Sequence, residues 1–352
     1  MRFTQQNSIA AAAVLALALF GADRLLDARR ADRRRGELRI GRLIPKEDRE
    51  RASVAAVQVD VGKESLVFAN ESGLWRSSWK HAVGSGDRLK SLIGKLHEAE
   101  GMIQSDDPAR AASFGFDPAR QVRVTLLDPQ LQSLGAFDLG TGFADRERCF
   151  VRRAGETKVW DVDANPWEEL APAAPGLPPL VHPFVMPYGW PGEGAGLMES
   201  VEVERPDGTA YKLTLHELEL TPEQMREENR QNYEWRLTRG IEPAAPTTGF
   251  LGPAYTLYLL KVPFLDVIDP AEAAGLGFDA PRGRVRLVPS KAQPAELVLA
   301  PKLSQGRHAL RCSVTGLAYR IDPQAQAILF PAAEQLLPPA TDNPWDPYLR
   351  RQ

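Results

Sequence analysis

The sequence predicts an α+β protein in which two tandem antiparallel-sheet-plus-helix repeats follow an N-terminal transmembrane helix. Three observations support this fold class. A passage recurs almost unchanged, as "AASFGFDPARQVRV" from Ala111 and as "AAGLGFDAPRGRVRL" from Ala273. Short segments of alternating apolar and polar residues flank turn signals in both halves of the chain, which is typical of antiparallel strands. An uncharged apolar run occupies residues 8–22.

The recurring passage belongs to a longer internal repeat. Four pairs of landmarks occur in the same order, and the two members of each pair are separated by 159 to 162 positions. The pairs are Trp75 with Trp235, Phe116 with Phe278, "FDLG" from 137 with "LVLA" from 297, and Asp163 with Asp322. A nearly constant separation over several landmarks indicates a duplicated domain. We therefore expect a first repeat at 52–170 and a second repeat at 197–335.

Both repeats have the same expected order of elements. A hairpin comes first, marked in the second repeat by the turn signal Asp207-Gly208, and a strand with a tryptophan follows. Apolar residues then recur at helical spacing in 87–103 and in 252–268, where Pro263 should end or kink the helix. Two to four further strands complete each repeat. The short connections favour an antiparallel α+β sheet over a doubly wound one.

The recurring passage itself predicts a corner between a short helix and a strand. In "DPARAASFGF" and "DPAEAAGLGF" an Asp-Pro pair suits the N-cap and first position of a helix, and a glycine suits a left-handed C-cap. The phenylalanine would then enter the core. The corresponding residues of the two repeats are Asp107 and Asp269, Gly115 and Gly277, and Phe116 and Phe278. The alternative is that Asp117 and Asp279 form a pair of binding residues.

A proline- and glycine-rich linker is predicted between the repeats, at 171–196, and a proline-rich tail at 336–352. Seven prolines in the linker prevent regular secondary structure. Both segments carry more apolar surface than a passive spacer needs. The residues of this possible interaction surface are Phe184, Met186, Tyr188, Trp190 and Trp345. The linker either packs across both domains or presents a docking surface.

Residues 1–35 predict a membrane anchor followed by an arginine-rich juxtamembrane segment. As a helix the run at 8–22 spans roughly 22 Å, short of the roughly 30 Å hydrocarbon core of a bilayer. We favour an uncleaved anchor, and a cleaved signal peptide is the alternative. Six arginines between positions 24 and 35 follow the run, so the positive-inside rule would hold the bulk of the chain in the cytoplasm. The same arginines could instead bind anionic headgroups, which leaves the orientation open.

Composition and motifs argue against several functional classes. The formal net charge of −3 gives no reason to expect a nucleic-acid partner. The five histidines lack neighbours at metal-ligand spacing, and neither a G-x-S-x-G nucleophile elbow nor a phosphate-binding loop is present. Cys149 and Cys312 are too few for a zinc site or a disulfide framework, and their pairing is left open. We therefore predict no catalytic residues, no metal, no cofactor and no enzymatic activity.

Several passages resemble the bacterial domain of unknown function 4340 family. They are "GLWR", "LKSLIGKL", "ARAASFGFDPARQVRVTL" and "CFVRRAGETKVWDVD", and the resemblance covers roughly residues 55–330, with both copies. The second copy departs more, because its helix contains Pro263. The resemblance implies proximity to auxiliary components of ABC transporters, including those tied to gliding motility, whose soluble parts lie outside the inner membrane. It supplies no catalytic residues.

The expected function is therefore a non-catalytic, membrane-anchored accessory or scaffold protein of the bacterial cell envelope. The run at 8–22 would contact the membrane, ABC transporter subunits would be the protein partners, and the soluble part would be periplasmic, in conflict with the positive-inside rule. The alternative is an envelope ligand-binding module with a glycan or lipid in the groove between the repeats. The aromatic candidates for such a platform are Trp75, Trp160, Trp235 and Tyr319.

Overall fold

The computed structural model describes residues 40–44, 53–117, 121–140, 148–192, 197–221, 232–247 and 251–337. The predicted anchor at 8–22 and the tail residue Trp345 lie outside these ranges. Within the described ranges, no helix is both long and apolar enough to cross a membrane.

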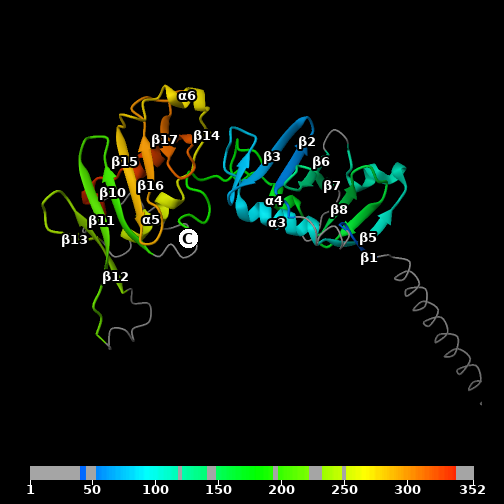
Figure 1. Ribbon diagram of the computed structural model, residues 1–352, viewed down its shortest axis with the longest axis horizontal. Helices are drawn as coiled ribbons and strands as arrows, with labels where there is room; N and C mark the ends of the chain where they lie inside the picture. The colour runs from blue at the N-terminus through cyan, green and yellow to red at the C-terminus, as the bar shows by residue number, and fades with distance from the viewer. Residues whose placement is uncertain are drawn as a thin grey trace, which may run out of the picture. The chain divides into compact units, whose positions relative to one another are not determined.

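The chain divides into two compact units (Figure 1). The first unit comprises residues 1–65 and 92–166, and the second comprises residues 66–91 and 167–352. Residues 66–91, which the sequence places in the first repeat, thus belong to the second unit.

One nine-stranded sheet has the strand order β1-β5-β9-β8-β7-β6-β2-β3-β4. Its strands are β1 (Ile40–Arg42), β2 (Ala56–Val61), β3 (Glu64–Glu71), β4 (Leu74–Ser77), β5 (Glu100–Ser105), β6 (Val122–Leu127), β7 (Ser133–Leu139), β8 (Cys149–Arg153) and β9 (Val159–Val162). The helical segments of this part of the chain are α3 (Gly86–His97), the 3-10 helix η1 (Pro108–Phe114) and α4 (Trp167–Leu170). Helix α3 is amphipathic, and its leucines Leu89, Leu92 and Leu96 are fully buried.

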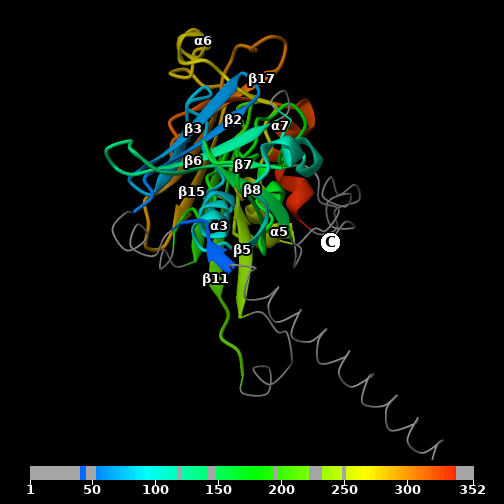
Figure 2. The ribbon, with the colours of Figure 1, turned by 90° about the vertical axis from the view of Figure 1, so that its right-hand side faces the viewer.

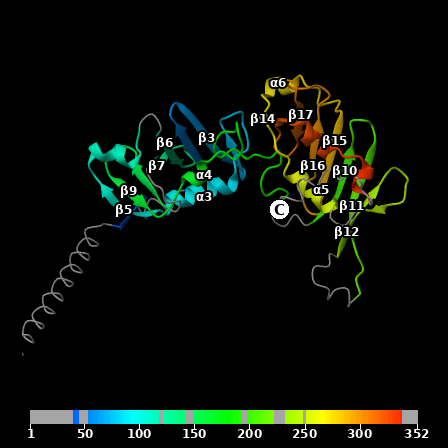
Figure 3. The ribbon, with the colours of Figure 1, turned by 180° about the vertical axis from the view of Figure 1, so that it is seen from behind.

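A second nine-stranded sheet has the order β13-β12-β11-β10-β15-β16-β17-β18-β14. Its strands are β10 (Met198–Glu204), β11 (Ala210–Glu217), β12 (Tyr233–Thr238), β13 (Ala245–Pro246), β14 (Asp266–Val267), β15 (Gly283–Pro289), β16 (Ala295–Leu299), β17 (His308–Cys312) and β18 (Ala318–Ile321). The helices are α5 (Leu251–Leu260), α6 (Pro270–Ala274), α7 (Pro323–Leu329) and the 3-10 helix η3 (Ala333–Leu336). Helices α5 and α6 lie at opposite ends of this sheet (Figures 2 and 3).

The two sheets share the order of eight strands. In the first sheet these strands are β5-β9-β8-β7-β6-β2-β3-β4. The second sheet, taken in the reverse direction, has the matching order β14-β18-β17-β16-β15-β10-β11-β12, so that each strand has one counterpart. The pairing register corresponds as well, because Val151 lies opposite Trp160 in the first sheet and Leu310 lies opposite Tyr319 in the second. All four of these side chains are buried. The fold class of two antiparallel α+β sheets is therefore confirmed.

The predicted helix-to-strand corners are present in both sequence repeats. Asp107 accepts a hydrogen bond from the Ala109 amide, and Asp269 accepts one from the Ala271 amide, each at 2.9 Å. The two corners end differently. Gly115 caps η1 in the left-handed region with a φ of 79°, whereas Gly275 caps α6 with a right-handed φ of −84°, and the left-handed residue is Gly277, with a φ of 82°. The phenylalanines Phe116 and Phe278 are buried, as expected.

Both predicted helices extended too far. Helix α3 ends at His97 and the residues that follow form β5, whereas the helical spacing predicted a helix to 103. A Cβ added at Gly101 would lie 2.6 Å from the Asp161 carbonyl oxygen, so the close approach of β9 requires glycine there. In the second sheet α5 ends at Leu260, before Pro263, and the end of the predicted helix forms β14. In both cases pairing with a buried neighbouring strand overrides the helical spacing.

Candidate functional site

The predicted interaction residues of the linker differ widely in exposure. Met186 is buried, Phe184 and Trp190 are partly buried, and the Tyr188 side chain is 67% exposed. Trp345 lies outside the described residues. Among the described linker residues, Tyr188 is therefore the aromatic side chain that a partner could reach directly.

The linker is held in place by backbone hydrogen bonds within the second unit. The Ser85 amide donates to the Leu180 carbonyl at 2.7 Å, and the His182 amide donates to the Val83 carbonyl at 2.8 Å. Further along, the Val185 amide donates to the Val262 carbonyl at 2.9 Å. Residues 180–185 therefore pair first with the residues before α3 and then with the residues after α5.

A buried histidine fixes the middle of this segment. His182 is 5% exposed, and its Nε2 lies 3.0 Å from the Met186 carbonyl oxygen. Because a carbonyl only accepts, Nε2 must carry the proton. Burial lowers the pKa of His182, against opposing effects of this hydrogen bond and of the Asp87 charge. The imidazole is therefore neutral near pH 7 and holds the linker through a single directed hydrogen bond.

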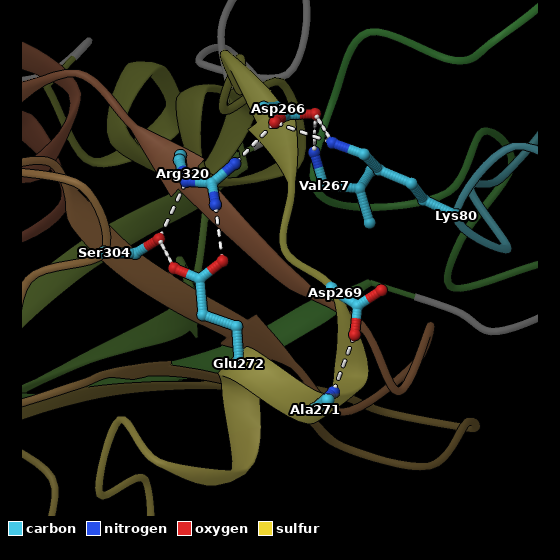
Figure 4. Close-up of polar contacts among 8 residues, drawn as sticks. All are labelled: Lys80, Asp266, Val267, Asp269, Ala271, Glu272, Ser304 and Arg320. Carbon is cyan, nitrogen blue, oxygen red and sulfur yellow. Dashed lines mark hydrogen bonds and ion pairs between the residues drawn. The ribbon is translucent and has the colours of Figure 1, made fainter.

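The second unit also contains a cluster of charged side chains, the Arg320 network (Figure 4). Its members are Lys80, Asp266, Glu272, Ser304 and Arg320. Arg320 is 7% exposed and donates from Nε to Ser304 Oγ at 2.7 Å, from Nη1 to Asp266 at 2.5 Å, and from Nη2 to Glu272 at 2.6 Å. Lys80 Nζ donates to both carboxylate oxygens of Asp266, at 2.6 and 2.8 Å. Ser304 in turn donates to Glu272 at 2.5 Å.

Each member of the Arg320 network comes from a different element. Arg320 lies on β18 and Asp266 on its edge partner β14, directly opposite in register. Glu272 lies on α6, whose N-terminus is fixed by the Asp269 cap. Lys80 lies in the turn after β4 with a φ of 51°, a backbone conformation that non-glycine residues rarely adopt.

The Arg320 network balances its own charge. Two cations face two carboxylates, and the Arg320 guanidinium donates from all three of its nitrogens. This arrangement suits a structural clamp, because it holds a two-residue edge strand, a short helix and a turn together. No sequence pattern predicts this network, since its members are single charged residues in separate segments.

The aromatic platform expected for a ligand-binding module is not formed. Its four candidates are at most 9% exposed, namely Trp75, Trp160, Trp235 and Tyr319. Close packing explains the burial of Trp235, because a Cβ added at Gly252 of α5 would lie 2.5 Å from its side chain. Tyr319 donates its hydroxyl to Thr315 Oγ1 at 3.0 Å inside the core. These residues stabilise the sheets and do not present an aromatic surface.

Both cysteines are buried and free, so they are not linked to each other. Burial, together with the Asp161 charge, raises the pKa of the Cys149 thiol to about 12. The Cys312 Sγ lies 3.5 Å from the Met186 Sδ, in the core beneath the linker. Within the described part of the chain, no group of three or more His, Cys, Asp or Glu residues could hold a metal ion.

Comparison with known proteins identifies one related family model. No curated protein matches the chain, and no solved structure matches it. Residues 82–174, which begin within the first sequence repeat and end four residues into the linker, match the model described as domain of unknown function (DUF4340).

Proposed function

We propose that the protein is a non-catalytic accessory or scaffold protein of the bacterial cell envelope, anchored in the inner membrane by residues 8–22. Its partners would be subunits of an ABC-type transporter, and its two sheets would lie on the periplasmic side. The link to transport rests on the family resemblance alone.

The observation that carries the anchored-scaffold proposal is the attachment of strand β1. This strand pairs with β5, and Arg42 binds Glu100 through Nε at 2.7 Å. The next two residues, Leu43 and Ile44, are 1% and 2% exposed. Because 17 residues separate Ala22 from β1, the first unit would lie within about 60 Å of the membrane even with that segment fully extended.

We further propose that both sheets are copies of one domain. The shared eight-strand order and the corresponding register of β8-β9 and β17-β18 support the duplication. A duplicated domain gives one anchored chain two related surfaces, which suits a scaffold that contacts more than one subunit.

The membrane topology can be tested with reporter fusions to the C-terminus. A periplasm-active reporter after residue 352 should be active, and a cytoplasm-active reporter at the same site should be inactive. The opposite pattern would place the sheets in the cytoplasm, as the positive-inside rule requires, and would overturn the periplasmic part of the proposal.

The partners can be tested by purification of the full chain in mild detergent. We expect transporter subunits to be recovered with it. Tyr188→Ala should reduce recovery, and Ile241→Ala, a fully exposed residue elsewhere in the second unit, serves as the matched control. A chain that runs alone from its native membrane contradicts the scaffold proposal. Recovery of a bound glycan or lipid instead would favour the ligand-binding alternative.

A further inference from the structure

The first sheet contains a carboxylate held between two arginines. Asp138 on β7 lies opposite Arg123 on β6 and opposite Arg152 on β8. Arg123 Nε donates to it at 2.7 Å and Arg152 Nη2 donates at 3.0 Å, while its side chain is 1% exposed. Burial would raise the pKa of Asp138, but hydrogen bonds from the two arginines outweigh that effect and lower it. The carboxylate is therefore ionised and neutralises one of the two guanidinium charges.

The second sheet keeps both arginines and lacks the carboxylate. Arg284 on β15 and Arg311 on β17 both lie opposite Val298 on β16. Their register matches that of Arg123, Asp138 and Arg152 in the first sheet. The correspondence extends to the corner, because the Arg152 guanidinium lies 4.9 Å from the centre of the Phe116 ring and Arg311 lies 4.9 Å from that of Phe278.

No carboxylate lies between Arg284 and Arg311, because Val298 occupies that position in the register. Among the described residues, neither guanidinium has an ion pair, and Arg284 Nε is buried without a hydrogen-bond partner. Arg152 Nε also lacks a partner, but that guanidinium binds Asp138 through Nη2. The nearest acidic positions in the register are Glu204, opposite Arg284, and Glu296, two residues before Val298, and neither lies within ion-pair distance of the two arginines.

A third cation adds to the unbalanced charge. Gln121, which hydrogen-bonds to Asp138 in the first sheet, lies one residue before β6, and Arg282 lies one residue before β15. Arg282 is exposed, and its charge acts together with burial to lower the pKa of His308 on β17, against the opposing charge of Asp322. Arg282 therefore places a further positive charge near this end of β15.

We propose that Arg284 and Arg311 form a binding site for an Asp or Glu side chain of a protein partner, which replaces in trans the carboxylate that Asp138 supplies within the first sheet. Val298 is 6% exposed and fills the internal position, so the partner carboxylate must approach the two partly buried guanidinium groups from solvent. A planar fork of donors suits a carboxylate. The identity of the occupant as a protein rests on the proposed scaffold function.

The test uses the purified full chain in a neutral detergent at low salt, with the pentapeptide acetyl-Gly-Ser-Asp-Ser-Gly-amide as probe. Calorimetry or shifts of arginine side-chain resonances should show binding in the millimolar range, and the matching Asn peptide should not bind. Val298→Asp supplies the internal carboxylate and should raise the dissociation constant at least about tenfold, the effect of losing a charge-assisted contact. Val288→Asp is the control, because Val288 lies on the same face of β15 as Arg284, and it should leave binding of the peptide unchanged.

A second variant covers the case in which Val298→Asp does not fold. Arg311→Gln keeps the length of the side chain and should also weaken binding of the Asp peptide. Equal binding of the Asp and Asn peptides, or unchanged binding by both variants, overturns the proposal. If the chain binds anionic phospholipid vesicles but not the peptide, the proposal that the occupant is a protein is overturned. Recovery of transporter subunits unaffected by Val298→Asp would overturn this site while leaving the scaffold proposal intact.

Discussion

The two sheets repeat their backbone more faithfully than their charges. Asp161 of β9 and Arg320 of β18 occupy corresponding positions, since Asp161 lies opposite Met102 of β5 and Arg320 lies opposite Asp266 of β14. Asp161 is a carboxylate held by Arg148 at 2.8 Å, whereas Arg320 is a guanidinium held by two carboxylates. The sign of the buried charge is reversed in the same place of the same fold.

This reversal shows which residues determine the fold. Apolar side chains on one face of each sheet set the strand order and register, because their burial depends on the alternation of the strand. A polar position requires only that its local charges balance, so opposite signs are equally compatible with the fold. Arg284 and Arg311 lack the carboxylate that lies between the corresponding arginines of the first sheet, and this is where we propose that a partner binds.

Removal of Arg320 should have the largest effect. Arg320→Met leaves Glu272 without its cation, while Asp266 keeps Lys80, so we expect a loss of about 3 kcal/mol in the stability of the second unit. Hydrogen exchange of β14, β18 and α6, resolved by peptide, measures this unit separately from the first. Lys80→Met is the control and should cost about 0.5 kcal/mol, because that pair is partly exposed. Equal effects of the two variants would show that Arg320 is not the centre of the network.

Exchanging the residue between the two arginines, Asp138 in the first sheet, should have a smaller effect on stability. Asp138→Val copies the second sheet into the first and should cost about 2 kcal/mol, because Arg123 and Arg152 are 42% and 22% exposed and can turn toward water. Asp138→Asn, which keeps the shape, should cost less. Exchange protection of β6, β7 and β8 reports the change. If Asp138→Val does not change stability, the carboxylate does not stabilise the first sheet. The contrast with the Arg284–Arg311 pair would then have no energetic basis.

The sequence predicted the repeated elements well because they depend on local spacing. Alternating residues, turn signals and the Asp-Pro corners are all encoded within a few positions. The ends of the helices were missed, because the pairing of β5 with β9 depends on a close backbone approach at Gly101 that no local pattern reveals. The Arg320 network was missed for the same reason: its charges meet only after the chain has folded. The unbalanced arginine pair became visible only from the pairing register of both sheets.

Lowering the pH should loosen the second unit before the first. The pKa of His182 is lower in the folded protein than its ordinary value of 6.5, so the unfolded chain takes up the proton first. The contribution of the neutral imidazole to the free energy of unfolding is fully present above pH 6.5. It is lost as the pH falls below that value. In the first unit Asp138 also has a lowered pKa, and its contribution to stability is lost only below its ordinary value of 3.8. Hydrogen exchange between pH 8 and pH 5 should show loss of protection around residues 180–186 and no loss in β6, β7 and β8 of the first unit.

His182→Gln should remove most of this pH dependence, since an amide can donate to the Met186 carbonyl without titrating. His308→Gln is the control. It removes the other histidine of the second unit whose pKa is lowered. The protection of residues 180–186 should stay as sensitive to pH as in the unaltered chain. The same pH dependence in His182→Gln would show that another group controls the linker.

The smallest effect concerns the corner at which both repeats turn into the sheet. Gly277 has a φ of 82°, and an added Cβ would lie 3.1 Å from the Pro301 ring, so Gly277→Ala should cost about 1 kcal/mol. Gly275, two residues earlier, has an ordinary φ of −84° and no contact closer than 3.5 Å, so Gly275→Ala should be neutral or slightly stabilising. Urea unfolding followed by exchange of β15 and β16 separates the two variants. Equal costs for both would mean that the left-handed conformation at Gly277 is not required, and that the second corner can turn by another path than the first.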